Sequence, residues 1–443
     1  MTWSHRKLAG LVAVAATLAV SAGSVATPAA AEPDTAVLEI WTRQPPDSPS
    51  AAVMQRLADA FTEQSGIPTE TVAIFEDFET KLQQRASQGD LPDIVINDTA
   101  QLGTLVDQGL VRPVNRDDIE GADAIAERAW GAAQGLDGET YAVPFSAQAF
   151  AFFIRSDWRE AVGLPVPESW DDLVALGTAF TEQDPDGNGE DDTAGFLIPG
   201  STVRGYTSWY WSTFLYGAGG DYFEDHGDGT FTTAIASPEA VTAAQWFQDL
   251  FCTHNIVNPG AVGNDTNTTH QVFEAGQAGI YLTGPYMLAR FEESIGADKL
   301  EIVAPPPGPG GDAGALAEGE NLYLMAGSDN EEGQELFAEF AASPAGQEIG
   351  MNGDDPGPIV RLPINTGVTM SDVRENPNWA VFDEVYNSAG VYSPVVGDWT
   401  PFRQMSADTL NALAADCSLE PQAEMESLAR QFDEELDRQG IRA

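Results

Sequence analysis

The stretch from residue 141 to residue 173 limits the possible folds most strongly, because it holds two strand signals with no loop between them. It begins Tyr-Ala-Val-Pro-Phe (141–145) and continues Ala-Phe-Ala-Phe-Phe-Ile (149–154). A short apolar run that is rich in aromatic residues predicts a strand buried on both faces. One strand thus passes a proline break and continues directly as another. This pattern favours a chain that leaves one lobe and enters a second, although a single sheet with an edge proline fits the same residues.

Helix signals follow at once. A short helical segment from Asp157 stops at Gly163 and Pro165. Ser169 then predicts the N-cap of a longer helix, with acidic residues in its first turn.

The residues before this stretch predict a regular alternation of strands and helices. Strands are expected at 37–41, 69–74 and 92–98, and helices at 51–64, 78–87 and 102–108. This order predicts a parallel sheet with crossover helices, in which ligands lie beyond the carboxyl ends of the strands. Trp41, Glu76, Asp98 and Phe145 fall at such ends. The 443 residues are enough for two or more domains.

The first 31 residues have the pattern of a signal peptide. A basic start at residues 5–7 precedes an apolar core at 8–20 and the small residues Ala29, Ala30 and Ala31. No later stretch is apolar for long enough to span a membrane. We therefore expect an exported protein, periplasmic or extracellular, that does not insert into the membrane.

The chain is strongly acidic, with a formal net charge of −49. Such a surface repels nucleic acid and anionic lipid, so neither is an expected partner. The scarcity of lysine favours a salt-rich habitat, while an ordinary solvated acidic surface is the alternative. The two cysteines, Cys252 and Cys417, are expected to form a disulfide in an exported chain, and two free buried thiols are the alternative.

Residues 184–192, Asp-Pro-Asp-Gly-Asn-Gly-Glu-Asp-Asp, predict a structural calcium site. Hard cations take oxygen ligands, and a tight loop must point several of them inward. The expected ligands are Asp184, Asp186, Asn188, Glu190 through its carbonyl, and Asp192 directly or through a water. Position 12 of the pattern is Gly195 rather than glutamate, so a distant ligand or more water is needed. The alternative is an acidic turn that faces solvent.

Motifs for catalysis are absent from the sequence. It contains no Gly-x-Ser-x-Gly, His-Glu-x-x-His or Gly-x-x-x-x-Gly-Lys pattern. After the signal peptide only His226, His254 and His270 remain, and none has metal-ligand spacing. The sequence therefore predicts a protein that is not an enzyme. A secreted glycoside hydrolase with paired carboxylates in an aromatic-lined cleft stays the alternative, because no motif excludes it.

Several segments, in their order, resemble the extracellular solute-binding proteins of ABC sugar importers, the family that includes maltose-binding protein. The resemblance covers nearly all of the chain after the signal peptide. It is carried by Pro-Asp-Ile at 92–94, Tyr-Ala-Val-Pro at 141–144 with Ser-Trp-Asp-Asp-Leu at 169–173, the segment 279–286, Ser-Pro-Ala-Gly-Gln at 343–347 and Leu-Pro at 362–363. Ile154-Arg155 departs from the family, which usually has Tyr-Asn there. Acidic loops like 184–192 also occur at this place in some of these sugar binders.

The resemblance implies a type II periplasmic-binding-protein-like α/β fold. Each of its two lobes is a sheet flanked by helices, and the ligand lies in a cleft between them. The implied lobe 1 comprises residues 32–145 and 303–342, and lobe 2 comprises 146–302 and 343–443, with crossovers near 145–148, near 303–307 and after residue 342. The implied function is delivery of a sugar, more specifically an oligosaccharide, to the permease subunits of an ABC importer by a monomer whose lobes close.

Sugar binding needs flat apolar faces for C–H surfaces and polar groups for hydroxyl pairs. The candidate residues are Trp41, Tyr206, Trp209, Tyr286 and Trp399 as platforms, and Glu76, Asp98, Gln148, Glu320, Asn321 and Arg403 as polar contacts. By resemblance, Asp98, Gln148, Trp209 and Tyr286 align with positions that line the family's cleft. Each aromatic residue could instead belong to the core.

Overall fold

The computed structural model describes residues 37–190, 192–310 and 313–443. The predicted signal peptide lies outside these ranges. None of the helices in these ranges combines the length and the apolar character needed to cross a membrane.

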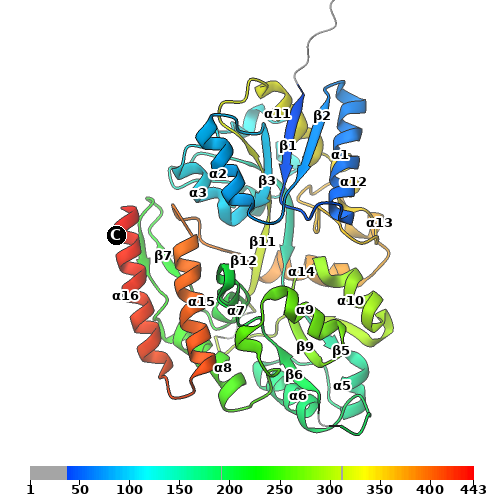
Figure 1. Cartoon of the computed structure of the whole chain (residues 1–443), viewed down its shortest axis with the longest axis vertical. Helices are drawn as coiled ribbons and strands as arrows, with labels where there is room; N and C mark the ends of the chain where they lie inside the picture. The colour runs from blue at the N-terminus through cyan, green and yellow to red at the C-terminus, as the bar shows by residue number, and fades with distance from the viewer. Residues whose placement is uncertain (1–36, 191, 311–312) are drawn as a thin grey trace, which may run out of the picture. The chain divides into compact units, whose positions relative to one another are not determined.

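The described residues form two main sheets and many helices (Figure 1). The strands are β1 (Leu38–Thr42), β2 (Thr69–Ala73), β3 (Ile94–Asp98), β4 (Val143–Ala149), β5 (Ala151–Arg155), β6 (Ala194–Leu197), β7 (Phe223–Asp225), β8 (Phe231–Thr233), β9 (Ala278–Thr283), β10 (Leu300–Val303), β11 (Ala315–Leu324) and β12 (Gly390–Tyr392). The α-helices are α1 (Pro49–Ser65), α2 (Phe78–Gln88), α3 (Leu102–Asp107), α4 (Glu127–Gly131), α5 (Ser156–Val162), α6 (Trp170–Glu182), α7 (Tyr206–Gly217), α8 (Pro238–Cys252), α9 (Thr266–Glu274), α10 (Leu288–Ile295), α11 (Glu331–Ala342), α12 (Pro344–Met351), α13 (Met370–Val373), α14 (Asn378–Ala389), α15 (Thr400–Ala415) and α16 (Pro421–Gln439).

The first sheet contains the parallel strands that the sequence predicts. β1 pairs in parallel with β2 on one side and with β3 on the other. β11 then pairs antiparallel with both β3 and β4, and in parallel with β12. Local signals set the helix ends: the Ser48 hydroxyl accepts a hydrogen bond from the Ala51 amide at 3.1 Å, and α1 stops at Gly66, whose φ is 76°. We call this sheet and the helices on it the first lobe.

The second sheet has the strand order β10-β5-β9-β6. β5 is antiparallel to both of its neighbours, whereas β6 and β9 are parallel. The helix signals around it are confirmed, since α5 ends at the left-handed Gly163 and the Ser169 hydroxyl accepts from the Asp172 amide at 3.2 Å. We call this sheet and its helices the second lobe.

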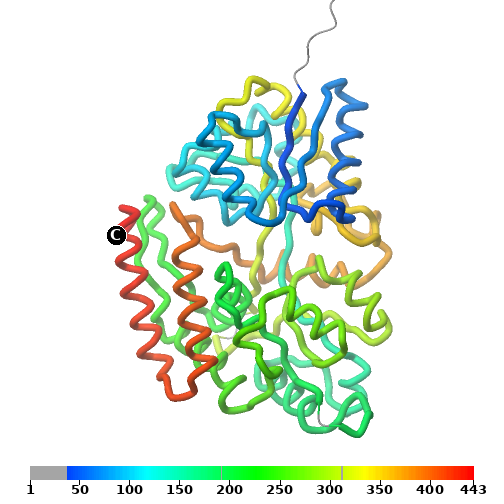
Figure 2. The backbone as a smooth tube through the Cα atoms, viewed as in Figure 1, coloured from blue at the N-terminus to red at the C-terminus, as the bar shows by residue number. Residues whose placement is uncertain are grey.

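The chain changes sheets at Phe150, which is fully buried. In Figure 2 the teal part of the backbone tube runs directly from the first sheet into the second. β4 belongs to the first sheet and β5 to the second, as the continuous apolar run suggested. The change comes slightly later than the expected 145–148, because β4 stays paired with β11 as far as Ala149 opposite Ala317. The second change falls between β10 and β11.

The third change of lobe differs from the predicted boundary at residue 343. Helix α12 packs against α1 and α11 of the first lobe, and Leu362 forms a bridge with Ala147 of β4. Helix α14 then contacts strands of both sheets. Of the helices that follow α12, α15 and α16 are the ones that pack against α7 and α8 of the second lobe. The segment after α12 therefore stays with the first lobe longer than the predicted boundary allows.

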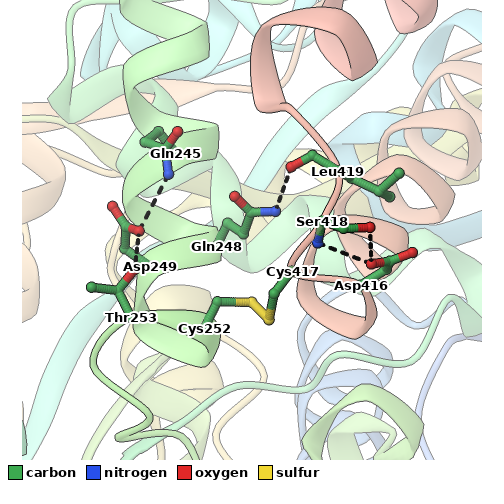
Figure 3. Close-up of a disulfide and its surroundings, with 9 residues drawn as sticks. All are labelled: Gln245, Gln248, Asp249, Cys252, Thr253, Asp416, Cys417, Ser418 and Leu419. Carbon is green, nitrogen blue, oxygen red and sulfur yellow. Dashed lines mark hydrogen bonds between the residues drawn. A yellow bond between two sulfur atoms is a disulfide. The ribbon is translucent and has the colours of Figure 1, made fainter.

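The predicted disulfide is confirmed. Cys252, the last residue of α8, is joined to Cys417, which lies between α15 and α16, with Cα atoms 5.6 Å apart (Figure 3). Gln248, one turn earlier on α8, donates to the carbonyl of Leu419 at 3.0 Å. The bond thus fastens the last helical hairpin to α8.

Candidate functional site

Strand β11 carries two buried carboxyl groups on one face. Glu318 and Glu320 are 5% and 3% exposed, and residues two apart on a strand point the same way. Gln148 of β4 lies opposite Glu318, and Asp98 of β3 lies opposite Glu320. Three neighbouring strands therefore bring Asp98, Gln148 and both glutamates together on one part of the first sheet.

Arg43, directly after β1, places a positive charge beside these carboxyl groups. Its Nη1 lies 2.9 Å from Asp98 Oδ2, and its Nε lies 3.7 Å from Glu79 Oε1. Burial opposes the charged guanidinium, but Asp98, Tyr206 and Glu79 outweigh this effect, so that the pKa of Arg43 is raised. This arginine stays charged and fixes the position of Asp98.

Two polar contacts link the lobes here. Arg43 Nη2 donates to the Tyr206 hydroxyl at 3.2 Å, and Arg204 Nη2 donates to Glu79 Oε1 at 3.2 Å. Arg204 itself has a φ of 55°, a left-handed conformation that non-glycine residues adopt rarely. The turn before α7 therefore presents both Arg204 and Tyr206 to the first lobe.

Aromatic side chains of the second lobe lie beside these groups. The Trp209 ring is 4.8 Å from Phe150 and 5.5 Å from Tyr206 between centroids. The Tyr286 hydroxyl is 3.1 Å from Thr283 Oγ1 and 3.5 Å from the Tyr210 hydroxyl. Trp209, Tyr206 and Tyr286 are only partly buried, so part of each side chain remains accessible.

Two more arginines complete the set. Arg361 Nη1 lies 3.5 Å from Glu320 Oε1, and its guanidinium is 5.8 Å from the Tyr286 ring centroid. Arg403 of α15 lies 5.9 Å from the Tyr206 ring centroid. Burial lowers the pKa of Arg403, while Tyr206, Asp98 and Glu318 oppose that effect. We call the following residues the interlobe cluster: Arg43, Glu79, Asp98, Gln148, Arg204, Tyr206, Trp209, Tyr286, Glu318, Glu320, Arg361 and Arg403.

The two glutamates of the cluster are poorly solvated. Burial, followed by repulsion from Asp98, raises the pKa of Glu318 to about 8, against the opposing effects of Gln148, Arg361 and Arg403. Burial also raises the pKa of Glu320, and there Arg361 and Arg43 oppose it while Asp98 adds to it.

Many polar atoms of the cluster are buried without a hydrogen bond from any described residue. They are Arg43 Nε, Gln148 Oε1, Trp209 Nε1, Glu320 Oε2, Arg361 Nε and Arg403 Nε. Buried polar groups in proteins are nearly always paired, and leaving one unpaired is costly. Six such atoms at one place, both donors and acceptors, are typical of a site that binds a polar ligand.

The structure brings together seven of the predicted contact residues: Asp98, Gln148, Tyr206, Trp209, Tyr286, Glu320 and Arg403. Four others lie elsewhere. Trp41 packs edge-on against Phe78, 6.1 Å between ring centroids, and Glu76 is exposed. Asn321 donates to the Ala132 carbonyl at 3.0 Å inside the first lobe. Trp399 packs against Phe402 and Tyr222 among the helices of the second lobe.

Sequence reasoning missed Arg43, Glu79, Arg204, Glu318 and Arg361. One signal was present, because Glu318 and Glu320 alternate within a strand whose other residues carry no charge. An acidic residue in a buried strand is unusual unless it has a partner or a function. The arginines carry no comparable local signal, since each lies in a connecting segment.

The acidic loop 184–192 folds around its own carboxylates. Asp184 Oδ1 and Oδ2 accept from the Asn188 and Gly189 amides at 3.1 Å and 3.0 Å. The Asn188 amide group lies within 2.9 Å of Asp186 Oδ2 and 3.2 Å of Asp192 Oδ1, so these oxygens converge. The described residues do not include Asp191. Among those that are described, no group of three or more His, Cys, Asp or Glu side chains is arranged to hold a metal ion.

The chain crosses three times between two lobes, and a polar and aromatic cluster lies between them. These features define a two-lobe binding protein. The chain belongs to the bacterial extracellular solute-binding protein family, whose model matches residues 45–348. The GacH receptor of Streptomyces glaucescens, solved unliganded and with acarbose, superposes with a TM-score of 0.76 at 19% identity, covering 90% of this chain and 97% of its own. This likeness confirms the predicted two-lobe α/β fold.

Relatives of known sequence cover most of the chain. A binding protein of Brucella abortus (strain 2308) is 23% identical over 363 residues, which are 80% of this chain and 82% of the relative. The maltotriose-binding protein of Pyrococcus abyssi is 24% identical over 369 residues, 80% of this chain and 69% of its own.

Proposed function

We propose that this protein binds a neutral carbohydrate reversibly between its lobes and delivers it to the permease of an ABC importer. The observation that carries the proposal is the interlobe cluster, where unpaired buried donors and acceptors adjoin partly exposed aromatic rings. Sugar hydroxyls both donate and accept, and the C–H faces of a sugar ring pack on aromatic faces. The names of similar proteins, which mention acarbose and maltotriose, support the same ligand class.

An oligosaccharide suits the cluster better than a single sugar ring. Tyr206, Trp209 and Tyr286 are three partly exposed aromatic residues, which is more stacking surface than one sugar ring needs. Arg43 and Arg204 are paired with Asp98 and Glu79, and Arg361 is paired with Glu320, so Arg403 is the one guanidinium of the interlobe cluster without an ion pair among the described residues. Three of the four cationic groups are therefore already neutralised, which favours a neutral sugar over an acidic one. The expected dissociation constant is about micromolar, equivalent to about −8 kcal/mol.

Binding without a reaction is expected. We propose that the protein acts as a monomer that is exported to the periplasm or the cell surface. The family name, extracellular solute-binding protein, supports this location. Closure of the lobes would then present a matched surface to the permease.

Calorimetry on a panel of neutral mono- and oligosaccharides, with a uronate oligosaccharide in parallel, tests the proposal. Saturable binding of a neutral sugar, with no released reducing ends after prolonged incubation, is the expected result. Binding of the uronate alone, or hydrolysis of any glycan, would overturn it.

We also propose a structural calcium ion in the loop at 184–192. The supporting observation is that Asp184, Asp186, Asn188 and Asp192 share hydrogen bonds at one end of the loop. Without a counter-ion, so many carboxylates in one turn repel each other, and a hard cation would draw their oxygens together. The ion would hold the loop that leads into β6 and would take no part in chemistry.

Calcium added to chelator-treated protein is expected to raise the melting temperature. Asp184→Ala combined with Asp186→Ala should abolish the rise. The matched control is Asp225→Ala with Asp228→Ala, at the exposed end of β7 and in the turn that follows it, and this variant should keep the rise. A melting curve indifferent to chelator and calcium would contradict the proposal.

A further inference from the structure

Glu318 differs from the other carboxyl groups of the interlobe cluster. Asp98 and Glu79 pair with Arg43, and Glu320 pairs with Arg361. Glu318 forms no ion pair within the described part of the chain, and its Oε2 accepts a single hydrogen bond from Gln148 Nε2 at 2.9 Å. A buried carboxylate without a cationic partner is costly, and such a group lowers the cost by binding a proton.

The charged groups around Glu318 do not remove this cost. Asp98 faces it from β3 and repels a negative charge. Arg361 and Arg403 attract it, but from beyond ion-pair distance. Tyr323 on β11 and Tyr392 on β12 also face it, and neither carries a positive charge. Burial thus dominates, and it raises the pKa of Glu318 to about 8.

Arg403 is the complementary group across the boundary between the lobes. Its Nε is buried without an acceptor among the described residues, and the guanidinium forms no ion pair there. Arg403 lies close enough to Glu318 to oppose the rise of its pKa, yet the two side chains form no ion pair. A neutral ligand oxygen between them could accept from both a protonated carboxyl and the guanidinium.

We propose that Glu318 carries its proton at neutral pH and donates it in a hydrogen bond to the ligand, so that binding is lost when the carboxyl ionises. The inference rests on the proposed function for its ligand, but not for the protonation of Glu318 itself. The proton comes from bulk water and returns to it, and no bond of the ligand changes. Glu318 is then a specificity-determining residue that makes sugar capture depend on pH.

Two independent measurements test the proposal. The first is the affinity for the sugar found by calorimetry. If only the protonated form binds, affinity should fall about tenfold from about pH 7 to about pH 9, following the protonated fraction. Glu318→Gln keeps a donor at this place, so it should bind at neutral pH and lose the pH dependence. Glu318→Ala should bind weakly at every pH.

The matched control is Glu335→Gln on α11, whose carboxylate pairs with Arg112 far from the cluster. This variant should keep the wild-type pH profile. A flat wild-type profile together with normal sugar binding would overturn the inference and leave the proposed function standing. An affinity that rises with pH would overturn it as well.

The second measurement needs no ligand. A carboxyl whose pKa is higher in the folded protein contributes stability that is complete below its unfolded pKa, about 4.3. That contribution is lost as the pH rises through about 8. The melting temperature of Glu318→Gln minus that of the wild type should therefore grow from about pH 5 to about pH 9. A constant difference would contradict the protonation of Glu318, whether or not any sugar binds.

Discussion

At the scale of single residues, Trp209 and Tyr286 are expected to supply the stacking surface of the site. Both rings are partly exposed, and both adjoin unpaired polar atoms. Replacing either with alanine should weaken sugar binding by about 1–3 kcal/mol through the lost apolar contact. Calorimetry measures the change directly.

The control for these two variants is Trp399→Phe, which keeps an aromatic ring in the core of the second lobe. Its affinity should match that of the wild type. Unchanged affinity in both the Trp209 and the Tyr286 variants would remove these residues from the site.

The aromatic residues also show what the sequence around a single residue cannot predict, namely whether its side chain is buried in the core or accessible in the site. Trp41 and Trp209 both looked like candidate platforms. Trp41 is buried against Phe78 and Arg85, whose guanidinium lies 5.3 Å from the ring centroid, whereas Trp209 is only partly buried. Trp41 is buried because Phe78 and Arg85 of α2 pack against it, and the sequence around Trp41 does not indicate these contacts.

At the scale of elements, the disulfide between Cys252 and Cys417 is expected to stabilise the hairpin of α15 and α16. The bond closes a loop over a sequence separation of 165 residues. The chain-entropy model predicts a stabilisation of about 4 kcal/mol or more for so long a loop. Reduction should therefore lower the melting temperature.

Intact mass after alkylation, with and without reductant, checks the bond itself. Two alkylated thiols in unreduced protein would contradict it. A Cys252→Ser, Cys417→Ser variant should melt at a lower temperature than the oxidised wild type and should not respond to reductant.

Elements were predicted better than their contacts. Alternating apolar patterns and capping residues such as Ser169 and Gly163 are local, and the structure confirms them. The lobe to which a segment belongs is not local. Helix α12 has the caps of any helix, and only its packing on α1 places it in the first lobe. The proximity of Glu318, Gln148 and Asp98 likewise depends on the register of three strands, which the sequence of no single segment determines.

At the scale of the whole molecule, the acidic charge should make stability depend on salt. The chain has 69 Asp and Glu residues against 20 Lys and Arg. Its arginines are largely committed to ion pairs, such as those of Arg85, Arg112 and Arg159. Most remaining carboxylates face water and repel one another across the surface.

Raising KCl from about 0.1 M to about 1 M shortens the screening distance from about 10 Å to about 3 Å. The repulsion among surface carboxylates should then fade, while the buried pairs of the interlobe cluster are screened much less. The melting temperature is therefore expected to rise with KCl, in the presence of chelator so that no calcium contributes. The same titration near pH 4, where carboxylates begin to take up protons, is the control and should give a smaller rise. A melting temperature independent of KCl at neutral pH would show that the acidic surface costs the fold nothing. The acidity would then be an ordinary solvated surface, without the adaptation to salt that the scarcity of lysine suggests.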